Sequence, residues 1–165
     1  MSDADTREVA QMEGTRDKVR SLWVPLREMN LLLPNVAVAE IGSYRAPEAR
    51  ADVPEWFLGM VKWREKAIAV ISLEAVCGLN VPSNPVFSRL MIVNSVSPDS
   101  PVEHYAIVTA GLPGLIRFGD DTADEVVEYE NDGLKCIVRI GQEEAVIPDL
   151  EYLQGLLEQQ LDSAA

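Results

Sequence analysis

The sequence lacks several features that would point to a membrane, an export route or a nucleic acid. Its longest apolar run is five residues, Ala67 to Ile71, which is too short to span a bilayer. The N-terminal stretch is of mixed charge and has no apolar segment typical of a secretory signal. The formal net charge is −13 and the basic residues form no cluster, so phosphate backbones and anionic membranes would be repelled. We therefore expect a cytoplasmic protein that neither binds nucleic acid nor inserts into a membrane.

Residues that carry most catalytic and metal chemistry are also scarce. His104 is the single histidine, and no serine or cysteine nucleophile stands in a recognisable arrangement with it. Cys77 and Cys136 are far apart and lie among apolar residues, which favours buried free thiols over a disulfide. The acidic stretch 120–125 lacks the glycine and the final glutamate of a calcium loop, so a solvated loop is expected. The sequence thus predicts no enzyme, no cofactor and no metal site.

What is present is the pattern of a mainly β domain. At 165 residues, 47% of them hydrophobic, the chain can bury the core of one domain or of two small lobes. Pro25 lacks an N–H group, so its segment is expected at a sheet edge or at a bulge. Short apolar segments recur along the chain, which is typical of small barrels or a sandwich rather than of a parallel sheet. They cover 22–26, 31–33, 40–45, 59–63, 67–71, 90–96, 105–109 and 134–140.

Short helical segments interrupt this pattern, and a longer one ends it. Asn35 can cap a single helical turn over 36–39, and Ser72 can cap a short helix over 73–77. The longer helix is predicted to begin near Asp149. Its apolar face keeps helical spacing and consists of Leu150, Leu153, Leu157 and Leu161.

An internal repeat indicates how the domain is built. The tripeptide A-V-I at 69–71 leads into L-E-x-V-x-G-L, and the same tripeptide at 145–147 leads into L-E-x-L-x-G-L. Each copy fits a strand that runs into a capped helix, so we predict two copies of one small β-lobe. Residues 1–20 are expected to form a flexible tail, followed by a single domain over 21–161. The Pro/Ser/Asn-rich connector at 80–88 is expected to be the boundary between the lobes.

The stretch GMVKWREKAIAVISL at 59–73 is the most regular of the predicted hairpins. Lys62 and Arg64 alternate with Val61 and Trp63, and a charged turn follows before the apolar run. Trp63 lies next to this exposed tip, in the only concentration of aromatic residues. It can belong to the lobe core or to an interface, because aromatic residues, methionine and arginine gathered at a strand edge have the composition of an interface centre.

Two stretches resemble the CheW-like domain, the adaptor module of bacterial chemotaxis. LLPNVAVAEI at 32–41 is similar to the family's A-L-P-x-x-x-V-x-E-V segment. PEWFLGMVKWREKAIAVISL at 54–73 follows, without a gap, the family's hairpin with its N-x-R-G turn and its V-I-D-L end. The second half echoes the family more loosely, at 105–109 and 147–153. The resemblance implies two SH3-like five-stranded β-barrel lobes with short helices and a C-terminal helix.

The resemblance also implies a function. Such a module is a non-enzymatic adaptor that couples the cytoplasmic tip of a methyl-accepting chemoreceptor to the regulatory domain of a CheA-type histidine kinase. An arginine at a hairpin tip can pair with a carboxylate or a carbonyl of a helix, because its guanidinium carries five fixed donors. The predicted interaction residues are the matched family determinants together with two neighbours at the tip: Val38, Glu40, Gly59, Lys62, Trp63 and Arg64.

The tip departs from the family pattern. Where the family has N-x-R-G, this chain has Lys62-Trp63-Arg64-Glu65. The divergence resembles accessory CheW-like proteins of type IV pilus chemosensory systems, which control twitching motility. Two alternatives remain open at this point. The altered tip can serve another pilus-signalling protein on the same fold, or the chain can be a small ligand-binding barrel with a pocket lined by His104 and acidic residues.

Overall fold

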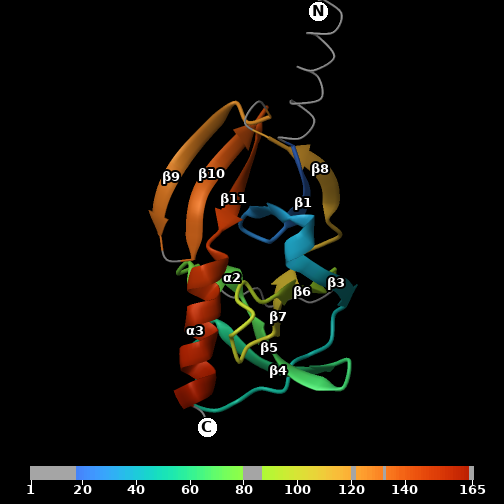
Figure 1. Ribbon diagram of the computed structural model, residues 1–165, viewed down its shortest axis with the longest axis vertical. Coiled ribbons are helices and arrows are strands. Elements are labelled where there is room, and N and C mark those ends of the chain that lie inside the picture. Colours follow the sequence, from blue (N-terminus) through green and yellow to red (C-terminus); the bar gives the residue numbers. More distant parts are fainter. Residues whose placement is uncertain (1–17, 80–86, 120–121, 132, 164–165) are drawn as a thin grey trace, which may run out of the picture.

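Two β-sheets and a C-terminal helix make up the protein (Figure 1). The computed structural model describes residues 18–79, 87–119, 122–131 and 133–163. The elements in chain order are β1 (Val19–Pro25), β2 (Asn30–Pro34), the 3-10 helix η1 (Asn35–Ala37), β3 (Val38–Ser43), β4 (Phe57–Trp63), β5 (Lys66–Ile71), α2 (Leu73–Val76), β6 (Arg89–Asn94), β7 (His104–Thr109), β8 (Gly114–Phe118), β9 (Glu125–Asn131), β10 (Leu134–Ile140), β11 (Glu143–Pro148) and α3 (Leu150–Ser163). The predicted mainly β fold is confirmed.

The two sheets share a topology that explains the sequence repeat. The strand order is β3-β6-β7-β5-β4 in the five-stranded sheet and β8-β1-β2-β11-β10-β9 in the other. The two A-V-I strands, β5 and β11, each pair antiparallel with the preceding strand and parallel with a strand of another hairpin. The five strands β3-β6-β7-β5-β4 therefore correspond in order to β8-β1-β2-β11-β10. The strand β9 is added at one edge, so this lobe has six strands where five were expected.

The boundary between the lobes does not follow the order of the chain. Most of the connector 80–88 lies outside the described residues, but β5 before it and β6 after it belong to the same five-stranded sheet. The N-terminal hairpin β1–β2 instead joins the sheet of the last strands, through the parallel pairing of β2 with β11. The prediction of a lobe boundary at 80–88 is therefore wrong. The predicted tail, residues 1–20, lies outside the described residues up to residue 17, and β1 already includes Val19.

Two local predictions also need correction. The strand β1 is not at an edge, because it lies between β8 and β2. Pro25 is tolerated there because pairing with β8 runs only from Val19 to Trp23 and so needs no N–H from the proline. The helical turn near Asn35 is a 3-10 helix with Pro34 at its N-cap position and no side-chain capping bond, so Asn35 is not the cap that was expected.

Most strands have two buried faces. A shared core between the sheets includes Leu31 and Val146 from one sheet and Ile107 from the other. A second cluster lies on the other face of the five-stranded sheet, where Val70 and Ile92 are buried. Because β5 contributes alternate residues to both clusters, it is apolar along nearly its whole length.

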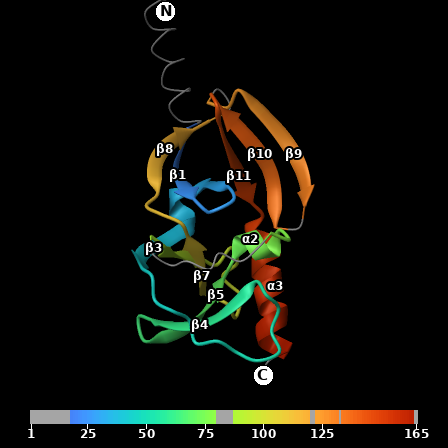
Figure 2. The same cartoon turned by 180° about the vertical axis from the view of Figure 1, so that it is seen from behind.

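The helices connect the two lobes. Ser72 caps α2, since its Oγ accepts a hydrogen bond from the Ala75 N–H at 3.3 Å, and Asp149 caps α3 through the Tyr152 N–H at 3.1 Å. The Ser72 cap agrees with the sequence prediction, and α3 begins near Asp149, as predicted. The helix α3 follows β11 of the six-stranded sheet and then runs alongside the five-stranded sheet, as the views from both sides show (Figures 1 and 2). Its buried Leu153 and Leu157 belong to the shared core.

Candidate protein-interaction surface

The β4–β5 hairpin ends in a two-residue turn that presents Arg64. Trp63 pairs with Lys66 across the hairpin, so only Arg64 and Glu65 form the turn, one residue fewer than the charged turn predicted. Both have left-handed backbone conformations, with φ of 47° for Arg64 and 65° for Glu65. Two successive positive φ angles are the geometry of a type I′ hairpin turn, whose twist matches that of the strands. The hairpin projects from the five-stranded sheet on the side of β3 (Figure 1).

Trp63 is buried beneath this tip. Its side chain is 7% exposed and belongs to the second cluster, on the face of the five-stranded sheet that points away from the shared core. Its ring lies 4.8 Å from the His104 ring, measured between centroids. A buried indole N–H needs an acceptor, and the Nε1 of Trp63 donates to Glu40 Oε2 at 2.5 Å. The structure thus places Trp63 in the core, with one polar contact toward the surface.

Glu40 and Arg64 lie together above the indole. The Arg64 guanidinium carbon is 4.5 Å from the centroid of the Trp63 ring, which is cation–π geometry. The Arg64 Nη2 is also 4.0 Å from Glu40 Oε1. The side chains of Arg64 and Glu40 keep 67% and 45% of their surface exposed. The structure therefore brings Glu40, Trp63 and Arg64 into one cluster, although Glu40 is on β3 and the others are at the end of β4.

Further charged residues surround the tip. Lys62 is exposed one residue before Trp63. Lys66 opens β5 and donates from Nζ to Glu103 Oε2 at 2.6 Å. This hydrogen bond, together with the positive charge of Lys66, lowers the pKa of Glu103. The hairpin end is thus richer in basic groups than the rest of this strongly acidic chain, which suits a partner that offers carboxylates or carbonyl groups.

Gly59 is covered rather than presented. It is buried at a bulge in β4, with φ of 139°, and the backbone of Glu48 pairs with Met60 directly beside it. A Cβ placed on Gly59 would lie 2.2 Å from the Glu48 carbonyl oxygen. Glycine is needed here because another strand-like segment passes close to its backbone. Gly59 can shape the hairpin, but its buried position gives a partner little to contact.

Val38 is half-buried, and a neighbouring valine is more exposed. Val38 pairs with Val93 on β6 and packs against the shared core. Val36 in η1 is 83% exposed, and its carbonyl accepts a hydrogen bond from Asn94 Nδ2 at 3.1 Å. Asn94 pairs with His104, and His104 contacts Trp63. Val36 therefore lies toward the same end of the five-stranded sheet as Trp63. The sequence prediction did not include Val36; the only signal for it was an apolar residue directly after Pro34-Asn35.

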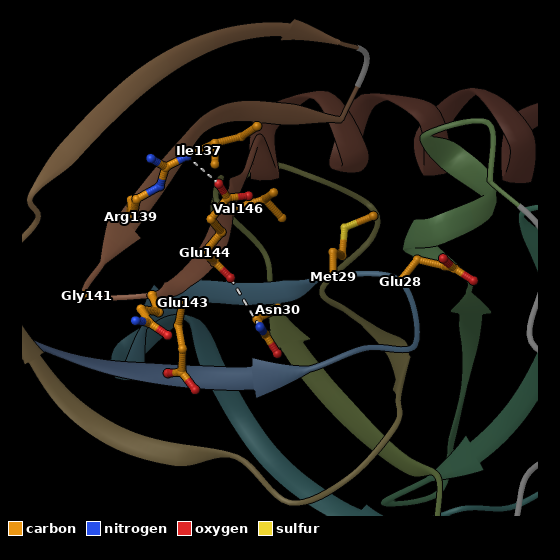
Figure 3. A pocket seen from close by; sticks show the side chains of 10 residues that line it. Glu28, Met29, Asn30, Ile137, Arg139, Gly141, Glu143, Glu144 and Val146 are labelled. Carbon is orange, nitrogen blue, oxygen red and sulfur yellow. Dashed lines mark hydrogen bonds and ion pairs between the residues drawn. The ribbon is translucent and has the colours of Figure 1, made fainter.

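A hollow lies on the six-stranded sheet (Figure 3). It has a volume of about 820 Å³ and lies between the β1–β2 turn and the β10–β11 hairpin. Arg139 reaches Glu144 at 2.8 Å and Glu125 at 3.3 Å, and Asn30 Nδ2 donates to the Glu144 carbonyl at 3.1 Å. The nearby glutamates raise the pKa of the Arg139 guanidinium. Arg139, the arginine that lines this hollow, is thus already paired with carboxylates of the same chain.

The pocket expected for a ligand-binding barrel is small. His104 and Glu103 line a cavity of about 120 Å³ together with Lys66 and Met60. Sites for small molecules usually measure about 300–1,000 Å³. Within the described residues, no cluster of three or more histidine, cysteine or acidic side chains is arranged to hold a metal ion. Cys77 and Cys136 are half-buried and form no disulfide with each other, and burial, reinforced by the charge of Glu74, raises the pKa of the Cys77 thiol to about 11.

The fold and this surface define a β-rich binding module, in which paired sheets carry an exposed arginine at a hairpin tip. The chain belongs to the CheW-like domain family, whose model matches residues 20–156. Members of this family are scaffold proteins of chemotactic signalling and not enzymes. Among solved structures, the scaffolding protein TtCheW from Thermoanaerobacter tengcongensis has the same fold, with a TM-score of 0.67 and 16% sequence identity. The match covers 81% of this chain and 90% of that one.

Two further comparisons are negative. No curated protein matches the chain significantly. In the part of the chain that the structure describes, none of the helices combines the length and the apolarity needed to cross a membrane.

Proposed function

We propose that this chain is a chemosensory adaptor that binds the cytoplasmic tip of a chemoreceptor and the regulatory domain of a CheA-type histidine kinase, in a system that controls type IV pili. Membership of the CheW-like family supports the adaptor role. The observation that carries the choice of surface is the cluster at the hairpin end, where Arg64 is exposed and is held beside Glu40 above Trp63. A guanidinium in a fixed orientation is suited to pair with a carboxylate or a helix carbonyl.

The departures at the tip support the assignment to pilus control. In the family pattern, asparagine and glycine flank the arginine, whereas here Lys62 and Glu65 occupy those places. A changed tip fits a changed partner, because specificity at an interface follows from matched charges. The second candidate keeps this fold and surface but replaces the receptor or the kinase by another pilus-signalling protein.

The test is reconstitution of a complex from purified proteins. The chain is mixed with the regulatory domain of a CheA-type kinase and the cytoplasmic tip of a chemoreceptor from the same organism, and size-exclusion chromatography with light scattering determines which species co-elute. The proposal expects a complex that contains all three proteins and fails to form without this chain. Failure to bind either protein, together with capture of a different pilus-signalling protein at the same hairpin, favours the second candidate.

A further inference from the structure

The face of the six-stranded sheet that carries the shared core continues beyond that core toward the edge strand β9. Register places four apolar residues side by side in one row across β2, β11, β10 and β9: Leu31, Val146, Ile137 and Val127. Exposure rises along this row, from none at Leu31 and 8% at Val146 to 46% at Val127. The row therefore begins inside the protein and ends as an apolar strip in solvent.

A row of charged residues runs beside the apolar row. Arg139 pairs across the strands with Glu144 on β11 and Glu125 on β9. Each of the three lies two positions along its strand from a member of the apolar row, so both rows are on the same face. The guanidinium of Arg139 is 2.8 Å from Glu144 and 3.3 Å from Glu125. These two glutamates outnumber the single arginine, and Glu28 and Glu143 line the hollow beside them. The charged row and its neighbours are therefore negative overall.

The hollow of about 820 Å³ opens over these two rows (Figure 3). Met29, on the β1–β2 turn, lies across it from Ile137 and Val146. The floor of the hollow is thus apolar and its rim is acidic, which suits a ligand with one apolar and one basic side. The strand β9, which extends this floor, has no counterpart in the five-stranded sheet. The surface therefore belongs to this lobe alone.

We propose that a basic amphipathic helix of a further partner protein binds here, on the β9–β11 face, which consists of Glu125, Val127, Ile137, Arg139, Glu144 and Val146. Spacing favours a helix over an extended segment. Neighbouring strands are about 4.8 Å apart, close to the rise of about 5.4 Å per helical turn. Residues on one side of an extended segment are about 6.6 Å apart. Apolar residues one helical turn apart can therefore contact successive members of the apolar row, with lysine or arginine beside the glutamates.

Charge argues against a helix of a second copy as the occupant. The helix α3 contains no lysine or arginine and carries Glu151, Glu158 and Asp162. Like charges on both sides of an interface oppose binding. The proposal does not rest on the proposed function, because the β9–β11 face belongs to the six-stranded sheet and the hairpin tip belongs to the other sheet.

Fluorescence anisotropy with a designed peptide tests the proposal. The probe is a labelled amphipathic helix of about 14 residues, or about four turns, with leucines on one side and lysines on the other. A matched peptide carries glutamates in place of the lysines. We expect wild type to bind the lysine peptide at least about tenfold more tightly than the glutamate peptide. Equal affinities, or no binding of the lysine peptide, would overturn the proposal.

Matched variants show whether the peptide binds at this face. Glu144→Lys should weaken binding by about tenfold. Glu103→Lys, which also reverses an exposed glutamate paired with a basic residue, should stay within about twofold of wild type. Val127→Ser should weaken binding by about threefold, because it removes apolar area. Val126→Ser, at the next residue of β9 and on the opposite face, should stay within about twofold of wild type. Equal effects within either pair would mean that the peptide is attracted to the acidic chain at large, and the proposal would be wrong.

Two measurements on wild type complete the test. In ¹⁵N-labelled protein, the lysine peptide should shift the backbone N–H resonances of Met29, Ile137 and Val146 more than those of the five-stranded sheet. Shifts centred on another part of the surface would overturn the proposal. Light scattering at rising protein concentration tests the second copy. A dimer that the lysine peptide dissociates would assign this face to self-association and overturn the proposed occupant, whereas a monomer throughout supports it.

Discussion

At the scale of single residues, the surface depends on how side chains are supported. Arg64 and Val36 are exposed near one end of the five-stranded sheet, whereas Trp63 is buried beneath the tip and Gly59 is buried further back along β4. Residues that sequence matching groups together therefore have different physical roles. Some can touch a partner, and others fix the backbone or the side chains that do.

Gly59→Ala should destabilise the protein rather than remove a contact. The new Cβ would lie 2.2 Å from the Glu48 carbonyl oxygen, and the backbone has φ of 139°. We expect a loss of about 2–3 kcal/mol in the free energy of unfolding, measured by urea denaturation, as is typical for overpacking combined with strain. Gly155→Ala is the control, because nothing lies within 4 Å of its Cβ on helix α3, and it should stabilise by about 0.5–1 kcal/mol. An unchanged stability of Gly59→Ala would contradict the close approach.

Val36→Asp should weaken binding without affecting the fold. Val36 is 83% exposed, so its replacement leaves the core intact, but a charge in an apolar contact costs desolvation. We expect the affinity for the partner at this surface to fall by about tenfold, as for a well-packed interface residue. Val126→Asp, at a 57% exposed valine on β9, is the matched control and should bind like wild type. Equal binding by both variants would show that Val36 lies outside the interface.

Glu74 should make the stability depend on pH. It is 2% exposed, and its Oε1 has no hydrogen-bond partner among the described residues. Burial raises its pKa from 4.5 to about 7, with a smaller contribution from the nearby Glu28. Because the folded state holds the proton more tightly, the stabilisation is complete below pH 4.5 and is lost as the pH rises through about 7. The loss is at most about 3 kcal/mol.

Urea titrations of wild type and Glu74→Gln between pH 5 and pH 8 check this expectation. The wild type should lose stability relative to the variant across this range, and the difference should level off above pH 8. Glu151→Gln, at an exposed glutamate in the first turn of α3, should keep the wild-type slope. Parallel pH curves for wild type and Glu74→Gln would mean that Glu74 is ionised in the folded protein at neutral pH.

At the scale of elements, the helix α3 is fastened to the loop between β6 and β7. The amide nitrogen of Gln154 lies 2.7 Å from Ser100 Oγ and from the Val102 carbonyl, and 3.0 Å from Ser95 Oγ. Ser100 also donates to Glu158 Oε1 at 2.5 Å. Since α3 follows the six-stranded sheet and this loop belongs to the five-stranded one, these bonds tie the lobes together.

Gln154→Ala should loosen this attachment. The substitution leaves the buried hydroxyl and carbonyl groups of the loop without their shared donor, so unfolding should become easier by about 1–3 kcal/mol. Amide hydrogen exchange should quicken in α3 and in residues 95–102 before it does so in the sheets. Gln159→Ala, at an exposed position of the same helix, should change stability by less than about 0.5 kcal/mol. Equal effects from both variants would show that the bonds to Gln154 contribute little.

The elements that could be predicted from sequence are those with a clear period. The β4–β5 hairpin, the capped helix α2 and the leucine face of α3 all follow from alternation, capping residues or helical spacing. The strands β8 and β9 could not be predicted in this way. Both are edge strands. The consecutive residues Val126 and Val127 of β9 are exposed, and so is Leu115 of β8, so the apolar residues do not mark a buried face in either place.

At the scale of the whole molecule, sequence order hides the arrangement of the lobes. The repeat was visible, because both copies keep the A-V-I strand and its following helix. The boundary between the lobes could not be seen in the sequence, because the hairpin β1–β2 joins its sheet by pairing with β11, more than 100 positions away. The link between Glu40 and Trp63 is hidden for the same reason: they are 23 positions apart and meet only because the sheet brings its two edges together.

The central claim is that the hairpin end bearing Arg64 binds the signalling partners, and the affinity of Arg64→Glu tests it most directly. Isothermal titration with the kinase regulatory domain and with the receptor tip compares wild type, Arg64→Glu and Arg139→Glu, a charge reversal at an exposed arginine of the other sheet. We predict that Arg64→Glu weakens binding to at least one partner by about tenfold or more, while Arg139→Glu stays within about twofold of wild type. An Arg64→Glu protein that binds both partners as tightly as wild type would contradict the account.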